Sequence, residues 1–187
     1  EAKYPLYLAM VQLKKGDKES ETAATASLLR AVHLNPDIGE AWGTMGEIAL
    51  RNDQLTIAAQ HFENARRLQP DVVRWRMDEA RLLNRRGEAE QAATLLTALR
   101  PEQRSDPAVL GVLAESYGLM RKPGDAAGAY AQAFKSVAPP SAELAYQAAL
   151  WFERAGDAGQ AKNFAKTAAM LGNADAKDLA SKLDHEQ

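Results

Sequence analysis

A repeat period of 34 residues is the feature that most constrains how this chain folds. Small residues recur at this spacing without exception, and a series of larger apolar residues keeps the same phase over three consecutive steps. The first series is Gly46, Ala80, Ala114 and Ala148, and the second is Phe62, Leu96, Tyr130 and Phe164. A fixed period of this size is typical of proteins built from stacked copies of one supersecondary unit. The sequence therefore predicts a repeat array with a core that runs along the chain.

Within each unit, the spacing of apolar residues is that of helices. Trp42, Met45, Gly46 and Ala49 lie three and four residues apart, which places them on one stripe of a helix. A second stripe follows after a short interruption, around Ala58 and its neighbours. Two stripes in each period predict two antiparallel helices, in which small residues allow close approach and large ones fill the space between neighbouring pairs.

Helix-breaking residues separate these segments. Those expected between units are Pro36-Asp37, Pro70-Asp71, Asp106-Pro107 and Pro139-Pro140-Ser141. Those expected at the turn inside each unit are Gly16-Asp17, Asn52-Asp53, Gly87-Glu88, Gly124-Asp125 and Gly156-Asp157. Proline ends a helix and glycine readily follows one, so both series agree with the helix-pair interpretation. In the first unit the turn comes early, which predicts a longer turn or a longer second helix.

Seven residues of the second unit resemble the tetratricopeptide repeat signature at its proper spacing. They are Trp42, Met45, Gly46, Ala58, Phe62, Ala65 and Pro70. The resemblance implies an all-α solenoid of antiparallel helix pairs with a right-handed superhelix, formed by residues 1–187 as a single domain. The expected units are a degenerate one at about 5–38, then 39–72, 73–106, 107–140 and 141–174, with a capping helix over 174–185. Arg76 and Glu79 depart from the signature, because large apolar residues are usual at their positions.

Composition argues against most kinds of chemical site. The net charge is −2, and lysine and arginine do not gather beside aromatic residues, so nucleic acid is not an expected partner. Cysteine is absent, and His33, His61 and His185 lie far apart without a second ligand at metal-binding spacing. No phosphate-binding loop or nucleophile motif occurs. We therefore expect no catalytic residue, metal or cofactor.

The tetratricopeptide resemblance implies a groove lined by the first helix of each unit, where residues off the packing stripe contact a peptide or helical segment of a partner protein. In the second and third units these residues are Glu40, Gly43, Glu47, Arg51, Arg74, Met77, Arg81, Asn84 and Arg85. In the fourth and fifth units they are Gly111, Glu115, Leu119, Ala145, Tyr146, Ala149 and Phe152.

One hypothesis places an acidic part of the partner on Arg74, Arg81 and Arg85 and an apolar part over Tyr146 and Phe152. The alternative is that the arginines are solvated or paired along their helix, as Arg81 is placed to pair with Asp78. The basic clamp with which some family members hold the carboxyl terminus of heat-shock chaperones is not reproduced here.

The role and the compartment stay open at this stage. The chain fits a non-enzymatic scaffold, adaptor or assembly factor, or a docking or regulatory module of a larger protein, such as the bacterial envelope assembly factors of cytochrome c maturation. No segment is apolar over the length needed to span a membrane. Because Glu1 is not a natural start, we expect that an upstream segment such as an export signal or membrane anchor has been removed, which favours the bacterial periplasm or a membrane-anchored protein.

Self-association through the amino-terminal end is a further possibility. Tyr4, Leu6, Tyr7 and Met10 form an apolar group there. These side chains either dock on a second copy of the chain or pack on the helix that contains Leu28 and Leu29, and we favour the second interpretation because the first pair of a solenoid needs a cover.

Overall fold

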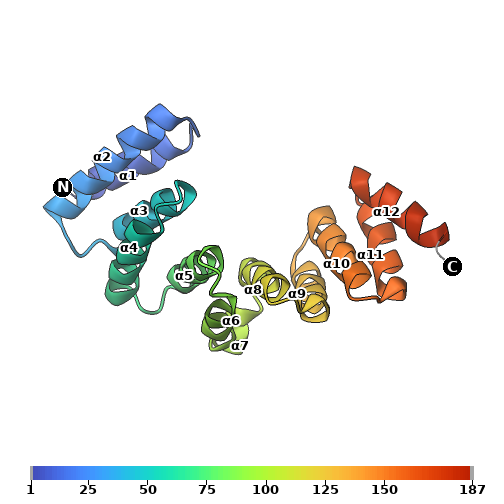
Figure 1. The fold of residues 1–187 in the computed structure, drawn as a ribbon. Coiled ribbons are helices and arrows are strands. Elements are labelled where there is room, and N and C mark those ends of the chain that lie inside the picture. Colours follow the sequence, from blue (N-terminus) through green and yellow to red (C-terminus); the bar gives the residue numbers. More distant parts are fainter. Residues whose placement is uncertain (1, 186–187) are drawn as a thin grey trace. The chain divides into compact units, whose positions relative to one another are not determined.

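The computed structural model describes residues 2–185, and every regular element in that range is a helix (Figure 1). The helices are α1 (Lys3–Leu13), α2 (Lys18–Leu34), α3 (Gly39–Arg51), α4 (Leu55–Leu68), α5 (Val73–Arg85), α6 (Ala89–Thr97), α7 (Pro101–Arg104), α8 (Pro107–Leu119), α9 (Pro123–Ser136), α10 (Ala142–Arg154), α11 (Ala158–Met170) and α12 (Ala174–His185). The predicted all-α fold is confirmed. The short helix α7 is an addition that the 34-residue pattern did not predict.

The chain forms two compact units, one up to Arg86 and the other from Gly87 onward. The first unit contains α1 to α5 and the second contains α6 to α12. The division falls inside the predicted repeat 73–106, between its two helices. That repeat is the one in which Arg76 and Glu79 replace the apolar residues of the signature. The predicted extension of one domain over 1–187 stays a prediction.

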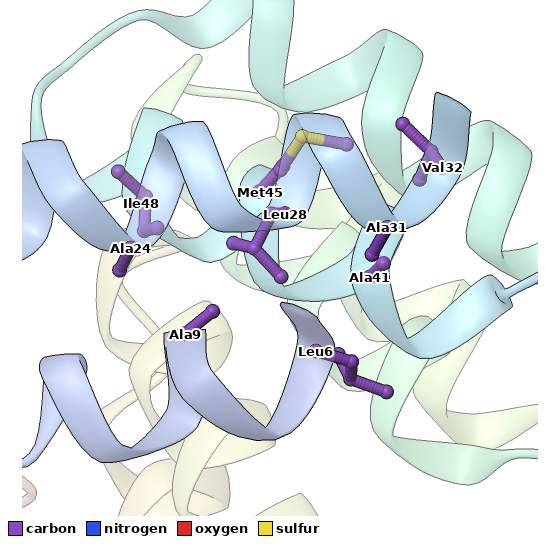
Figure 2. Packing of buried hydrophobic residues seen from close by; sticks show 9 residues of the cluster. All are labelled: Leu6, Ala9, Ala24, Leu28, Ala31, Val32, Ala41, Met45 and Ile48. Carbon is purple, nitrogen blue, oxygen red and sulfur yellow. The ribbon is translucent and has the colours of Figure 1, made fainter. Parts of the chain in front are cut away.

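The amino-terminal part of the first unit is held together by a cluster from three helices (Figure 2). Leu28 of α2 is fully buried between Leu6 and Ala9 of α1 and Met45 of α3. The small residues on these helices allow close contact between them, since a bulky side chain at Ala9 or Ala24 would push the helices apart. Of the amino-terminal apolar group, only Leu6 packs on α2 as favoured. That interpretation is wrong for Tyr4, Tyr7 and Met10, which are exposed, as is Leu29 of α2.

Two glycines of α3 set how closely its neighbours approach. A methyl group at Gly46 would meet the ring of Phe62 on α4, and one at Gly43 would meet the ring of Trp75 on α5. Trp75 is only 2% exposed. It therefore supplies, one position earlier, the large apolar side chain that Arg76 does not provide.

The second unit repeats this arrangement with a different set of residues. Its core consists largely of alanines on α9, α10 and α11, and Gly118 of α8 lies against the ring of Trp151 on α10. At the carboxyl end, Leu179 and Leu183 of α12 pack with Ala161 and Ala165 of α11. Helix α12 is thus the capping helix that the sequence predicted.

The turn inside each helix pair contains a residue with a left-handed backbone. This residue is glycine at Gly16, Gly87 and Gly156, but it is Asp53 after α3 and Arg121 after α8. The prediction that Gly124-Asp125 forms the inner turn is wrong, because both residues lie in the first turn of α9, which begins at Pro123. Proline is well suited to the first turn of a helix. In the first pair, it is the second helix that is longer, with 17 residues in α2.

Candidate partner-binding surfaces

In the first unit, the predicted groove residues of α3 and α5 form an ion-paired surface. Arg74 donates from Nε to Oε1 of Glu47 at 2.8 Å, which joins the two helices. The guanidinium of Arg74 also lies 3.9 Å from Oδ2 of Asp78, one helical turn further along α5. These contacts place carboxylates from both helices around one guanidinium.

Asp78 is the centre of this surface, and it is a carboxylate with only 2% of its surface exposed. Arg81 donates from Nη1 to its Oδ1 at 2.6 Å, so the predicted pairing of these two residues along the helix is confirmed. Burial raises the pKa of Asp78 from 3.8 to about 6, and the negative charge of Glu47 adds to this, while Arg81 acts in the opposite direction.

The remaining predicted arginines of the first unit are also paired. Arg51 contacts Glu21 of α2 at 3.0 Å, and Arg85 contacts Asp53 at 2.8 Å. Each of the four arginines on this surface therefore has a carboxylate beside it. The surface is rich in charge but close to balanced, so it does not present the unopposed positive patch that the sequence hypothesis assumed for Arg74, Arg81 and Arg85.

Three polar atoms on α5 are buried without a hydrogen-bond partner among the described residues. They are both side-chain amide atoms of Asn84 and the Oδ2 atom of Asp78. Buried polar groups are nearly always paired, and leaving one unpaired costs about 1 to 3 kcal/mol. Met77 lies on the same helix and is half-buried. The amide of Asn84 therefore leaves a donor and an acceptor unused beneath the surface of this helix.

In the second unit, the predicted residues fall into exposed and packed groups. Glu115 and Leu119 of α8 are exposed, and Leu119 has 58% of its surface accessible. Tyr146 and Phe152 of α10 are half-buried and pack against the carboxyl-terminal core. The ring of Phe152 stacks on Phe164 at 5.5 Å. This surface is aromatic where that of the first unit is charged.

Some predicted contact residues lie in the core. Ala145 and Ala149 have no exposed surface, and Gly43 is covered by Trp75. Because these three residues have small side chains, a neighbouring helix approaches closely and covers them. We leave these three residues out of the surfaces discussed below.

Residues 2–185 contain no group of three histidine, cysteine or acidic side chains placed to hold a metal ion. His61 instead lies with its ring centroid 5.5 Å from that of Trp42, and burial lowers its pKa. Within the described helices, none is both long and apolar enough to cross a membrane.

Comparison with known proteins agrees with this architecture. Residues 49–115 match the tetratricopeptide repeat family model. The fold of the chain is the tetratricopeptide solenoid fold. The matched residues include the Trp75 helix, which the visible signature left uncertain. No curated protein sequence matches the chain significantly.

Solved tetratricopeptide structures have the same fold at low sequence identity. Residues 41 to the end of MamA from Desulfovibrio magneticus RS-1 superpose with a TM-score of 0.74 at 16% identity, covering 91% of this chain and 94% of that one. The protein pilF of Pseudomonas aeruginosa gives 0.77 at 16% identity, covering 97% and 88%. YrrB, described as a tetratricopeptide protein with an unusual peptide-binding site, gives 0.68 at 15% identity, covering 97% and 92%. The tetratricopeptide fold is in general a scaffold for protein–protein interaction, and its members are generally not enzymes.

Proposed function

We propose that this tetratricopeptide protein binds an extended segment of a partner protein on the α3–α5 surface of its first unit, through hydrogen bonds to the partner's main chain. The observation that carries the proposal is the side-chain amide of Asn84, whose oxygen and nitrogen are buried without a hydrogen-bond partner among the described residues. A side-chain amide has both a donor and an acceptor, which match the C=O and N–H groups of an extended peptide. The peptide-binding site described for YrrB supports the same kind of ligand.

Charge balance makes main-chain recognition a better fit than recognition of an acidic segment. An acidic partner would have to displace Glu47, Asp78 or Asp53 from the arginines that they already pair with. Exposed ion pairs contribute only about 0 to 1 kcal/mol to stability. Replacing a carboxylate of the protein by one from the partner therefore costs little free energy, but it also gains little. The arginines fix the edges of the surface, and Met77 offers an apolar contact between them.

In the second unit, we propose that exposed Leu119 and the accessible parts of Tyr146 and Phe152 contact apolar side chains of a partner. Aromatic side chains are enriched where proteins meet, because they bury a large area with little loss of conformational freedom. A non-enzymatic scaffold or adaptor role follows from both surfaces.

The test uses peptides selected on the whole chain from a displayed random library. The substitution Asn84→Ala removes the unpaired amide, so we expect peptide affinity to fall about tenfold while the protein is as stable as before or more stable. Asn163→Ala, at an exposed position on α11, is the matched control and should change neither quantity. Equal affinity of the Asn84→Ala variant and the parent for every selected peptide would reject main-chain recognition at this site.

A further inference from the structure

Helix α1 has an apolar outer face that no described part of the chain covers. Its inner side, with Leu6 and Ala9, packs into the core of the first unit. The opposite side exposes five large apolar residues, which we call the α1 outer face: Tyr4, Tyr7, Leu8, Met10 and Val11. The exposed fractions reach 74% at Tyr4, 62% at Tyr7 and 58% at Val11. A helix that is apolar on all sides is normally buried on all sides.

The charged side chains on α1 and on the two residues that follow it are all lysines. Lys3 precedes it, Lys14 and Lys15 follow it, and all three are exposed. At 100° per residue, these lysines project on the same half of the helix as the two tyrosines. Residues 2–16 contain no acidic side chain, although the whole chain has a net charge of −2. Lys15 interacts electrostatically with Asp17, which begins the next helix, whereas no ion pair among the described residues involves Lys3 or Lys14.

We infer that the α1 outer face docks on an anionic lipid surface, with α1 parallel to the membrane plane. Tyrosine places its ring among acyl chains and its hydroxyl at the headgroups, and lysine stems run along apolar surface while their ammonium groups contact lipid phosphates. An apolar helix face between lysines is typical of helices that lie in the membrane interface. With 11 residues, α1 is about 16 Å long, which is too short to span the bilayer and suits a helix lying on it.

The same charges disfavour a second copy of the chain as the occupant. Antiparallel packing of two α1 outer faces around a twofold axis would bring Lys3 of each copy towards Lys14 and Lys15 of the other. Like charges at both ends of the contact would oppose association, and α1 has no carboxylate to offset them. A lipid surface supplies the negative charge that this arrangement lacks.

The experiment measures co-sedimentation of the whole chain with vesicles. We expect binding to vesicles of phosphatidylcholine with about 30% phosphatidylglycerol, little binding to pure phosphatidylcholine, and loss of binding as salt concentration rises. Changing Lys3, Lys14 and Lys15 together to glutamine should lower the partition coefficient about a hundredfold. The double substitution Tyr7→Ser with Val11→Ser should lower the partition coefficient by about tenfold or more, because these two changes remove apolar area that enters the lipid.

Met170→Ser is the matched control, because Met170 is also highly exposed but lies at the end of α11. It should bind vesicles as the parent does. All these positions are exposed, so circular dichroism should show unchanged helix content in each variant. Absence of binding to the anionic vesicles, or binding that both α1 variants retain, would overturn the inference. Light scattering that shows a dimer dependent on Tyr7 and Val11, without vesicle binding, would assign the face to self-association instead.

Discussion

The α3–α5 surface of the first unit and the α8–α10 surface of the second unit both contain a contact between glycine and tryptophan, but the side chains around that contact have opposite chemistry. In each, a tryptophan on the later helix covers a glycine on the earlier one: Trp75 on Gly43 and Trp151 on Gly118. Each tryptophan also has an arginine over its ring, Arg74 at 5.3 Å and Arg154 at 4.5 Å. The surrounding surface is an ion-paired network in the first unit, whereas it is alanine and aromatic residues in the second. The two contacts occupy different repeat positions, because at the 34-residue period Gly43 corresponds to Gly111 and Trp151 corresponds to Leu83. The same kind of contact is therefore built at different places in the two units.

The largest effect that we expect separates the two glycine contacts. Gly43→Ala should destabilise the protein by about 3 kcal/mol and Gly118→Ala by about 1 kcal/mol, because Trp75 is enclosed whereas Trp151 is half-buried and has room to move. Denaturant unfolding measures both. Gly111→Ala on α8, where an added methyl group meets nothing within 4 Å, is the control and should be neutral or stabilising. Equal losses at Gly43 and Gly118 would show that the two contacts are equally rigid.

The buried carboxylate of the first unit predicts a pH dependence that the second unit does not share. The folded chain holds the proton of Asp78 up to a pH of about 6, but the unfolded chain releases it near 3.8. Between these values the folded state binds more protons, so raising the pH favours unfolding. Relative to Asp78→Asn, the parent should lose about 2 kcal/mol of stability between pH 4 and pH 7.

Denaturation of both proteins at several pH values tests this expectation. Glu47→Gln should narrow the pH range over which stability falls, because it removes the negative charge that helps to raise the pKa of Asp78 in the folded chain. A stability difference between parent and Asp78→Asn that stays constant across this range contradicts the prediction.

Arg121, which follows α8 in the second unit, is a position where substitution should stabilise the protein by a smaller amount. Arg121 has a φ of 57°, a left-handed conformation that costs a non-glycine residue about 1 kcal/mol. Arg121→Gly should raise the free energy of unfolding by roughly that amount. Gly156→Ala, after α10, is the reverse change and should lower it. Thermal unfolding of the two variants gives the comparison, and a loss of stability in Arg121→Gly would mean that the arginine side chain makes a compensating contact.

The smallest effect is expected at the exposed part of the second surface. Leu119→Ser should change stability by less than about 0.5 kcal/mol, because the side chain is mostly in water. It should, however, weaken binding to selected peptides that carry apolar side chains. A large stability loss would place Leu119 in the core rather than on a binding surface.

Most of the fold could be predicted because the repeat fixes packing positions. The recurring series at Gly46 and Phe62 identified the helix pairs, and Leu179 with Leu183 identified the cap. The inner turn of the fourth repeat was missed because an arginine, not a glycine, has the left-handed backbone there. Local composition does not reveal that conformation, since Gly124 nearby was the more obvious choice.

The surfaces were harder to predict than the fold. The sequence predicted the local pairing of Arg81 with Asp78, but Glu47 and Asp53, the partners of Arg74 and Arg85, lie about 30 residues away and are brought close only by folding. Asn84 was named as a candidate, but nothing in the pattern indicates that its amide is buried and unpaired. Trp75 could have been found by allowing the repeat to shift by one residue.

The placement of the three tryptophans allows intrinsic fluorescence to report on the two units separately. Trp42 and Trp75 belong to the first unit and Trp151 to the second. Replacing Trp42 with phenylalanine would leave one tryptophan in each unit. Trp75 is buried against Gly43, whereas Trp151 is half-buried with the guanidinium of Arg154 over its ring. Their emission spectra should differ in wavelength, so a single fluorescence titration can follow whether the two halves of the chain melt together or one after the other.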